Sequence, residues 1–223
     1  ISTLDISLAG TTSVSSVSIE CRFHGFTIDK ELQKFTTNIV NKHHTLLSAN
    51  SIHNLSVMVM EVETGNVLSY VGNVYQQATN EHGHEVDIIT APRSSGSILK
   101  PFLYCHALEA GVITPSALLT DVPTYMNGYA PKNFYDNYDG LVPANEALSR
   151  SLNVPFVRLL IRYGQRRFLD QLKRDGFSNF VFSAEHYGTS LILGGAEVSL
   201  EDLVQAYANL GNSASRTTNI QEF

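Results

Sequence analysis

The sequence predicts an α+β fold in which one β-hairpin is joined to a mainly helical body. Two β-type runs flank the turn at residues 63–66, and this order of strand, tight turn and strand over residues 55–73 predicts the hairpin. The later apolar residues recur at helical spacing, in segments that end at glycines. An isolated pair of strands is only marginally stable, so we expect further strands or helices to cover its apolar faces.

Length and composition indicate a globular chain. Its 223 residues are 43% hydrophobic and 16% charged, which is enough to bury a sizeable core. The formal net charge of −6 and the lack of a basic stripe argue against a nucleic-acid partner. The basic cluster at residues 162–167 is typical of a solvated helix start. Since no apolar run reaches the roughly 18 residues of a membrane span and no secretory signal opens the chain, we expect any membrane anchor to lie upstream.

The N-terminal part is predicted to hold a leader followed by a helix. Residues 1–25 are rich in serine and threonine and are interpreted as a leader or linker segment, and the domain itself is predicted over residues 26–223. Its first helix is predicted over residues 26–47, with Thr27 or Asp29 as the cap. The apolar positions of this helix are Leu32, Phe35, Ile39, Val40 and Leu46.

Four helical segments are predicted after the hairpin. The first runs from Ser97 to Ala110 and stops at a glycine. It contains Cys105, which we interpret as a buried free thiol, because Cys105 and Cys21 alone make no disulfide framework. A long connection rich in aromatic residues and prolines then leads to three segments that each end at a glycine, at residues 143–164, 166–176 and 199–211.

A serine and a lysine three residues apart open the first of these segments. On a helix, Ser97 and Lys100 would lie on one face, where a neutral amine could take the proton of the hydroxyl. Lys100 can act as a base only if burial or a neighbouring cation lowers its pKa. A serine at a helix N-terminus also has free N–H groups near a developing oxyanion. The spacing alone occurs by chance about 0.6 times in such a chain, so a helix-capping serine and a snorkelling lysine remain the alternative.

The pattern S-x-N occurs twice, at residues 48–50 and 151–153. The first copy lies at the expected end of a helix in a polar stretch, whereas the second lies where two helical segments could meet over a buried seam. We therefore expect Ser151 to pass a proton between Lys100 and a leaving group. Asn153 would hold Lys100 and bind a substrate amide. Together with the serine nucleophile, these residues suit acyl transfer.

Four stretches resemble successive landmarks of the transpeptidase domain of class A penicillin-binding proteins. The resemblance covers roughly residues 26–212 in family order, and the last stretch is most similar to the 1C branch. It implies a penicillin-binding/serine β-lactamase-like transpeptidase fold within the α+β class. The four stretches are RSSGSILKPFLY (93–104), GYAPKNFYDNYDG (128–140), ALSRSLNVPFVRLL (147–160) and YGTSLILGGAEVSLEDLVQAYANL (187–210).

The resemblance implies a D,D-transpeptidase of peptidoglycan synthesis. Ser97 matches the acylated serine and Lys100 the general base, while Ser151 and Asn153 match the second motif. The implied substrate is a peptidoglycan stem peptide ending in D-Ala-D-Ala, from which D-alanine leaves before an amine of a neighbouring stem resolves the acyl-enzyme. β-Lactam antibiotics would acylate the same serine, and no cofactor is implied. The implied location is the bacterial cell envelope, on the extracytoplasmic (periplasmic) side of the inner membrane.

The family's third motif, K-[ST]-G, has no match, because no lysine of the chain is followed by Thr or Ser and then Gly. The resemblance places this motif and the strands after it beyond Phe223, together with the second oxyanion donor; the first is the N–H of Ser97. Losing one such donor typically costs about 10²–10³ in rate. We therefore expect the natural protein to continue past Phe223, and residues 1–223 alone to be acylated poorly.

Three alternatives remain beside the interpretation that the resemblance implies. A non-catalytic penicillin-binding module or β-lactam sensor of the same fold would be labelled by penicillin without releasing D-alanine from a peptide. A class A β-lactamase needs E-x-x-x-N after the second motif, and Glu185, Glu197 and Glu201 all lack that asparagine. His82 and His84 have the spacing of metal ligands, but a polar loop explains them equally well and we predict no metal.

Overall fold

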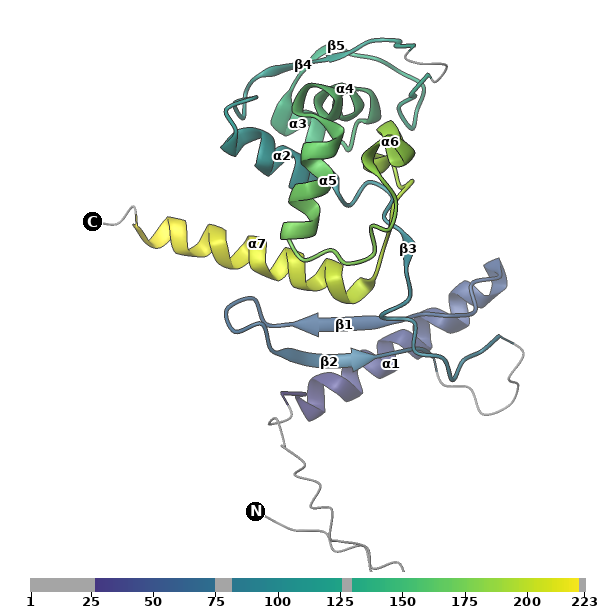
Figure 1. Cartoon of the computed structure of the whole chain (residues 1–223). Coiled ribbons are helices and arrows are strands. Elements are labelled where there is room, and N and C mark those ends of the chain that lie inside the picture. The colour runs from purple at the N-terminus through teal and green to yellow at the C-terminus, as the bar shows by residue number, and fades with distance from the viewer. Residues whose placement is uncertain (1–26, 75–81, 126–129, 221–223) are drawn as a thin grey trace, which may run out of the picture.

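The computed structural model describes residues 27–74, 82–125 and 130–220, with side chains as far as residue 215. The predicted leader at residues 1–25, and Cys21 within it, lie outside the described residues. Figure 1 shows a helical body above a hairpin and two long helices. The elements are α1 Lys30–Leu47, the 3₁₀ turn η1 Ser48–Asn50, β1 Val57–Met60, β2 Val67–Val71, β3 Arg93–Ser94, α2 Lys100–Glu109, β4 Leu118–Asp121, β5 Gly140–Pro143, α3 Ala144–Ser149, α4 Asn153–Tyr163, α5 Gln165–Arg174, α6 Ala184–Tyr187, the 3₁₀ turn η2 Gly188–Ile192, β6 Glu197–Val198 and α7 Leu200–Ile220.

The predicted hairpin is confirmed, and helices cover it. Strands β1 and β2 pair in antiparallel fashion, and Figure 1 places them between α1 and α7. The backbone N–H of Asp29 donates to the carbonyl of Leu68 on β2 (2.9 Å). At the turn of the hairpin, the side-chain amide of Asn212 on α7 donates to the carbonyl of Glu63 (3.4 Å). The described part of the chain therefore covers the ribbon with helices.

Helix α1 begins where the sequence predicts, but most of its apolar positions do not lie on its buried face. Asp29 is the N-cap and accepts a hydrogen bond from the N–H of Leu32 (2.7 Å). The buried residues are Thr36, Val40 and His44, whereas three of the apolar positions are exposed, namely Phe35, Ile39 and Leu46. The helix is therefore oriented by its contacts with β2 rather than by its largest side chains.

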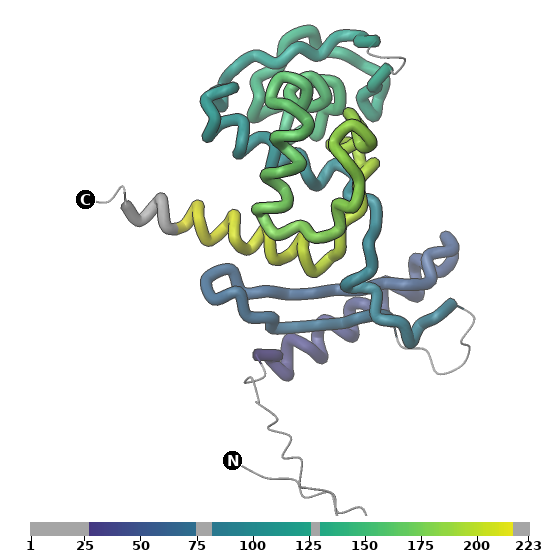
Figure 2. Tube along the Cα trace, viewed as in Figure 1, coloured from purple at the N-terminus to yellow at the C-terminus, as the bar shows by residue number. Residues whose placement is uncertain are grey.

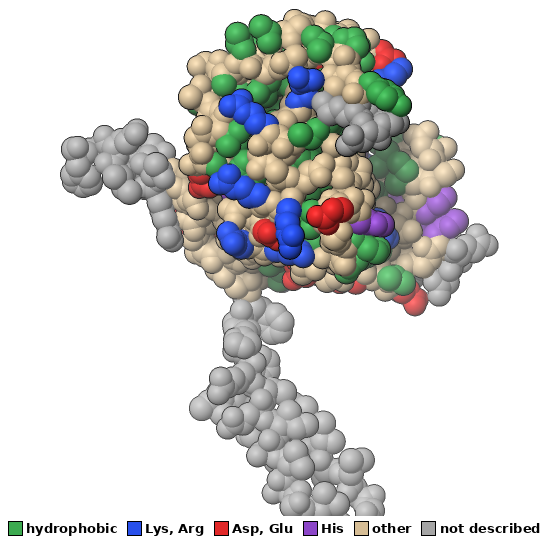
Figure 3. All heavy atoms as spheres, turned by 45° about the horizontal axis from the view of Figure 1, so that its top comes forward, with side chains coloured by type: hydrophobic (Ala, Val, Ile, Leu, Met, Phe, Trp, Pro, Cys, Tyr) green, Lys and Arg blue, Asp and Glu red, His purple; other side chains and the backbone are tan. Residues whose placement is uncertain are grey.

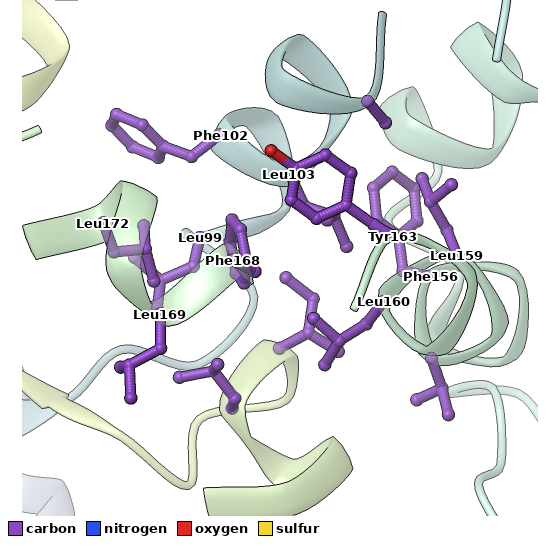
Figure 4. Close-up of a cluster of buried hydrophobic side chains, with 14 of the residues drawn as sticks. Leu99, Phe102, Leu103, Phe156, Leu159, Leu160, Tyr163, Phe168, Leu169 and Leu172 are labelled. Carbon is purple, nitrogen blue, oxygen red and sulfur yellow. The ribbon is translucent and has the colours of Figure 1, made fainter. Parts of the chain in front are cut away.

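The core of the protein lies in the helical body. Side chains from α2, α4 and α5 pack together there, as Figure 4 shows. Ring contacts join this cluster to its neighbours, since Phe102 meets Phe177 at 5.3 Å and Tyr207 of α7 at 5.0 Å between ring centroids. The labelled members of the cluster are Leu99, Phe102, Leu103, Phe156, Leu159, Leu160, Tyr163, Phe168, Leu169 and Leu172.

The predicted helical segments exist, but three boundaries were wrong. The segment predicted from Ser97 becomes helical only at Lys100, and residues 96–99 form a turn. The segment at 143–164 is two helices, because Ser151 has a left-handed backbone (φ 53°) that interrupts the helix. Helix α7 continues past Gly211 to Ile220. A β carbon at Gly211 would lie 3.1 Å from Val62, so this glycine permits close packing on the hairpin rather than ending the helix.

Two short strand pairs, which the sequence did not reveal, connect distant parts of the body. Strand β3 pairs with β6, and β4 pairs with β5, both in antiparallel fashion. Figure 2 shows the segment that holds β3 rising from the hairpin into the body, where it leads to α2. The β3–β6 pair therefore fixes the stretch just before Ser97.

The surface of the helical body is of mixed charge. On the face shown in Figure 3, Lys and Arg side chains occupy separate places with Asp and Glu side chains among them. Arg166 and Arg167 are exposed at the start of α5, as predicted for a solvated helix start. No helix among the described residues is long and apolar enough to cross a membrane.

Candidate active site

Ser97 lies in a turn that is held from both sides. Its neighbour Ser95 donates a backbone hydrogen bond to the carbonyl of Ala196 beside β6 (3.0 Å). Within the turn, the N–H of Ile98 donates to the carbonyl of Ser95 (3.1 Å), and that of Lys100 to the carbonyl of Ser97 (3.1 Å). The Ser97 residue itself is exposed. The turn therefore presents Ser97 to solvent from a fixed backbone.

Lys100 is the largest polar side chain in the interior. The residue is 1% exposed, although lysine is rarely buried. Its ammonium donates to the carbonyl oxygen of Ser151 (2.7 Å), to the hydroxyl of Ser151 (3.2 Å) and to Oδ1 of Asn153 (2.7 Å). The ring of Phe156 lies 5.8 Å from the amine nitrogen. The structure thus joins three of the four predicted site residues around one buried amine.

Burial lowers the pKa of the Lys100 amine from 10.5 to about 8. The charged form loses hydration in the interior, and this effect outweighs the three acceptors that face it. A pKa near 8 means that a substantial fraction of the amine is neutral in mildly alkaline solution. A neutral amine has a lone pair and can accept a proton.

The hydroxyl of Ser97 makes no hydrogen bond to Lys100 or Ser151 within the described part of the chain. An ammonium has three N–H donors and no acceptor, and those of Lys100 already face three oxygens. The charged amine therefore cannot accept the proton of Ser97 in this arrangement. Deprotonation of Lys100 would supply the missing lone pair.

Ser151 lies in the break between α3 and α4. Its φ of 53° is unusual for a residue other than glycine, and it directs both the carbonyl and the hydroxyl of Ser151 toward Lys100. Non-glycine residues in the left-handed region cost roughly 1–2 kcal/mol. Such strain is often found at functional sites.

Residues 132 and 133 also reach this site, and the sequence analysis missed them. The carbonyl of Lys132 accepts from the side-chain amide of Asn153 (2.9 Å), and the side chain of Asn133 accepts from the N–H of Asn153 (2.9 Å). They lie in the stretch PKNF within one of the four landmarks. The sequence feature that could have indicated them is a polar Lys–Asn pair inside an otherwise aromatic connection. No neighbouring residue indicates which helix this pair contacts.

The two histidines with metal-ligand spacing lie away from this site. The ring of His82 stacks on His53 with 3.7 Å between centroids, and His84 is buried and meets His82 edge to face. Within the described ranges, no group of three His, Cys, Asp or Glu side chains is arranged to hold a metal ion. Cys105 is a half-buried thiol in α2, and burial raises its pKa.

Comparisons with known proteins find similar sequences and similar folds. The penicillin binding protein transpeptidase domain matches residues 55–218. Penicillin-binding protein 1C of Escherichia coli K12 is 38% identical over 81% of this chain and 23% of its own length. Penicillin-binding protein 1A of Rickettsia felis is 31% identical over 73% of this chain and 20% of its own length. The chain thus spans about a fifth to a quarter of the length of these relatives.

Solved structures agree on the fold. The penicillin-binding protein PonA1 of Mycobacterium tuberculosis has a TM-score of 0.66 at 23% identity, covering 82% of this chain and 49% of its own, and was also solved in complex with penicillin V. Penicillin-binding protein 1A of Haemophilus influenzae has a TM-score of 0.60 at 28% identity, covering 70% of this chain and 23% of its own. These likenesses confirm the predicted penicillin-binding/β-lactamase-like fold.

Proposed function

Because the chain belongs to the penicillin-binding protein transpeptidase family, we propose that it transfers acyl groups through a serine acyl-enzyme, with Ser97 as the nucleophile. The observation that carries this proposal is the buried Lys100 amine. Its pKa is lowered to about 8, and its oxygen partners come from Ser151 and Asn153. Lys100 is buried and has no carboxylate partner in the described part of the chain. A role as a general base therefore explains its burial better than a structural ion pair does.

In the first step, the hydroxyl oxygen of Ser97 attacks the carbonyl carbon between the two terminal D-alanines of a peptidoglycan stem peptide. The neutral Lys100 amine takes the hydroxyl proton as the ester bond forms. The carbon–nitrogen bond to the last D-alanine then breaks. Ser151, which contacts Lys100 (3.2 Å), passes that proton to the leaving amine, so that Lys100 is neutral again and D-alanine departs.

In the second step, an amine of a neighbouring stem attacks the ester carbon. Ser151 carries a proton from this amine to Lys100 as the new amide bond forms. The ester carbon–oxygen bond then breaks, and Lys100 returns the proton to the Ser97 oxygen, which restores the hydroxyl. A β-lactam ring offers Ser97 a strained amide in place of the peptide, so ring opening leaves a stable ester on the same oxygen.

The oxyanion of each step forms beside the Ser97 turn. The N–H of Ser97 donates to no group in the described part of the chain, and it precedes helix α2, so it is available to a developing negative charge. Asn153 holds Lys100 through Oδ1 and lies at the start of α4, where it could also meet the substrate amide.

The family acts on peptidoglycan, which lies outside the cytoplasm, and we place this domain on the extracytoplasmic side of the bacterial inner membrane. Residues 26–223 would form the transpeptidase unit, with residues 1–25 as a leader or linker. No cofactor takes part in either step, and the partners are stem peptides and β-lactam antibiotics.

The test is to incubate the chain with an excess of a fluorescent penicillin for long enough to reveal the slow acylation expected of residues 1–223, then to digest it and map the adduct by mass spectrometry. We expect one adduct on the peptide that contains Ser97, its loss in Ser97→Ala, and its retention in Ser116→Ala, which changes an exposed serine elsewhere. Release of D-alanine from a peptide ending in D-Ala-D-Ala measures the complete reaction. An adduct on another residue, or none, would overturn the proposal.

A further inference from the structure

The side chain of Asn133 is buried, and each of its hydrogen-bonding groups is used. It is 4% exposed. Its Nδ2 donates to Oδ1 of Asp121 (2.8 Å) and to the carbonyl of Asn137 (2.9 Å), and its Oδ1 accepts from the backbone N–H groups of Asn153 (2.9 Å) and Val154 (3.2 Å). An amide side chain offers two donors and two lone pairs, so this one is fully satisfied.

Asn133 caps helix α4 from outside the helix. The first N–H groups of any helix lack partners within it, and α4 begins at Asn153 with those of Asn153 and Val154. The residue in the N-cap position, Leu152, has no side-chain acceptor to offer. Asn133, twenty residues earlier in the chain, supplies the oxygen instead. Its position therefore determines where α4 starts and where Asn153 lies.

The same loop sets which way the Asn153 side chain points. The Nδ2 group of Asn153 donates to the carbonyl of Lys132 (2.9 Å), which leaves Oδ1 to face the ammonium of Lys100 (2.7 Å). A reversed amide would turn its N–H donors toward a cation and its oxygen toward a carbonyl. Lys132 and Asn133 thus fix the backbone and the amide of Asn153 together.

Asp121 anchors this arrangement. It is 1% exposed and lies at the end of β4, opposite Gly140 on β5. One carboxylate oxygen accepts from Asn133, and the other accepts from the backbone N–H of Asp139 (3.1 Å). Asp121 therefore holds two points of the loop at residues 133–139 against the strand pair.

We propose that Asn133 is a positioning residue for acyl transfer: anchored by Asp121, it caps α4 and holds Asn153 so that the amide oxygen of Asn153 faces Lys100. The inference rests on the proposed function of this site. It predicts a role in the reaction for two side chains that touch neither Ser97 nor Lys100.

The direct test compares Asn133→Ala with Asn145→Ala in the full chain of 223 residues. Asn145 is exposed on α3, and its side chain accepts from the next backbone N–H (2.9 Å), so it is a matched control. We expect Asn133→Ala to be labelled by a fluorescent penicillin roughly 10²-fold more slowly per folded molecule, because a small misplacement of catalytic groups has that effect. Asn145→Ala should keep the parent rate. Labelling of Asn133→Ala at the parent rate would overturn the inference.

A reciprocal exchange tests the contact with Asp121. Asn133→Asp keeps the acceptor for α4 but sets two buried carboxyl groups against each other, which disfavours ionisation of both. Adding Asp121→Asn restores a donor–acceptor pair with its direction reversed. We expect Asn133→Asp to be labelled slowly, and the double variant to be labelled at least tenfold faster than Asn133→Asp. If the double variant is as slow as the single one while its melting temperature recovers, the positioning role is wrong.

A double-mutant cycle with Asn153 separates positioning from general destabilisation. If Asn133 acts through Asn153, then Asn133→Ala should slow labelling much less in an Asn153→Ala background than in the parent, because residues that act as a unit are not additive. Equal slowing in both backgrounds would show that Asn133 only supports the fold.

Hydrogen exchange tests the capping role of Asn133 independently of the proposed function. In Asn133→Ala, the N–H groups of Asn153 and Val154 should exchange about tenfold faster or more, the loss expected for a hydrogen bond of this kind, while the N–H of Leu160 in the same helix stays protected. Unchanged exchange at Asn153 and Val154 would contradict the capping role. A parent chain without any penicillin adduct would overturn the proposed function, and the exchange result would still decide whether Asn133 caps α4.

Discussion

The α carbon of Gly96 lies 2.8 Å from the place that a β carbon on Gly194 would occupy. The two glycines belong to segments about a hundred residues apart, and Ser94 reinforces their contact by donating its hydroxyl hydrogen bond to the carbonyl of Gly194 (2.7 Å). Real β carbons do not approach other backbone atoms this closely. The segment at residues 194–196 therefore packs directly on the turn that carries Ser97.

Gly194→Ala should displace the Ser97 turn. The substitution adds a clash with Gly96 to the strain of a positive φ (101°). We expect a loss of about 2–5 kcal/mol in the free energy of unfolding, from roughly 1–2 for φ and roughly 1–3 for overpacking. Urea denaturation and penicillin labelling measure the two effects. Gly176→Ala is the control, because Gly176 has a similar φ (107°) and open space around it. It should cost only about 1–2 kcal/mol and leave labelling unchanged, and equal losses at both positions would contradict the packing argument.

The rate of acylation should rise with pH through about 8. The reaction needs the neutral form of Lys100, whose pKa is lowered to about 8, so the rate should increase about tenfold per pH unit between pH 6 and 7 and level off above pH 9. Time courses of penicillin labelling of the chain across this range give the profile. A flat profile would show that another group activates Ser97.

Lys100→Arg should abolish acylation while the fold is kept. A guanidinium stays protonated at every accessible pH and cannot accept the Ser97 proton, so we expect labelling to fall by about 10²–10⁴-fold, the usual contribution of a general base. Circular dichroism melts check the fold. Lys34→Arg, on the exposed surface of α1, is the matched control and should label normally. Parent-like labelling of Lys100→Arg would exclude Lys100 as the base.

Ser151→Gly should be more stable than Ser151→Ala, although both should react slowly. Both variants lose the hydroxyl that contacts Lys100, so labelling should fall by about 10²-fold in each. Only glycine relieves the left-handed backbone at this position, and we expect it to raise the free energy of unfolding by about 1 kcal/mol relative to alanine. Ser51, also left-handed (φ 61°) and exposed, should show the same difference between glycine and alanine with unchanged labelling. Equal stability of the two Ser151 variants would argue against strain there.

The contact between His106 and Asp175 should make stability depend on pH. Its Nε2 lies 2.7 Å from Asp175, and this hydrogen bond, with help from Glu109, raises the pKa of His106 above 6.5 despite its partial burial. A raised pKa means that the stabilisation is complete below pH 6.5 and is lost as pH rises through the folded-state pKa. In urea denaturation, the free energy of unfolding of the parent should exceed that of His106→Gln by about 1–2 kcal/mol at pH 5.5 and by less at pH 9. An advantage that grows with pH would contradict this assignment.

Much of the fold could be predicted from the sequence because its signals are local. The hairpin follows from two β runs around one turn, and helix α1 begins at a capping aspartate, Asp29. The α+β class and the family resemblance follow from such signals taken in order. Each depends on residues that are neighbours along the chain, and the structure confirms the hairpin and the Asp29 cap.

Only the tertiary structure decided how these segments meet. The sequence could not show that α1 buries Thr36 rather than Phe35, that Gly194 packs on Gly96, or that Asn133 caps a helix twenty residues later. The lowered pKa of Lys100 is of the same kind, because it arises from the burial of the amine among segments that the chain brings together. Burial and hydrogen-bond geometry depend on which surfaces exclude water from each other, and that is a property of the packed chain rather than of any short stretch of it.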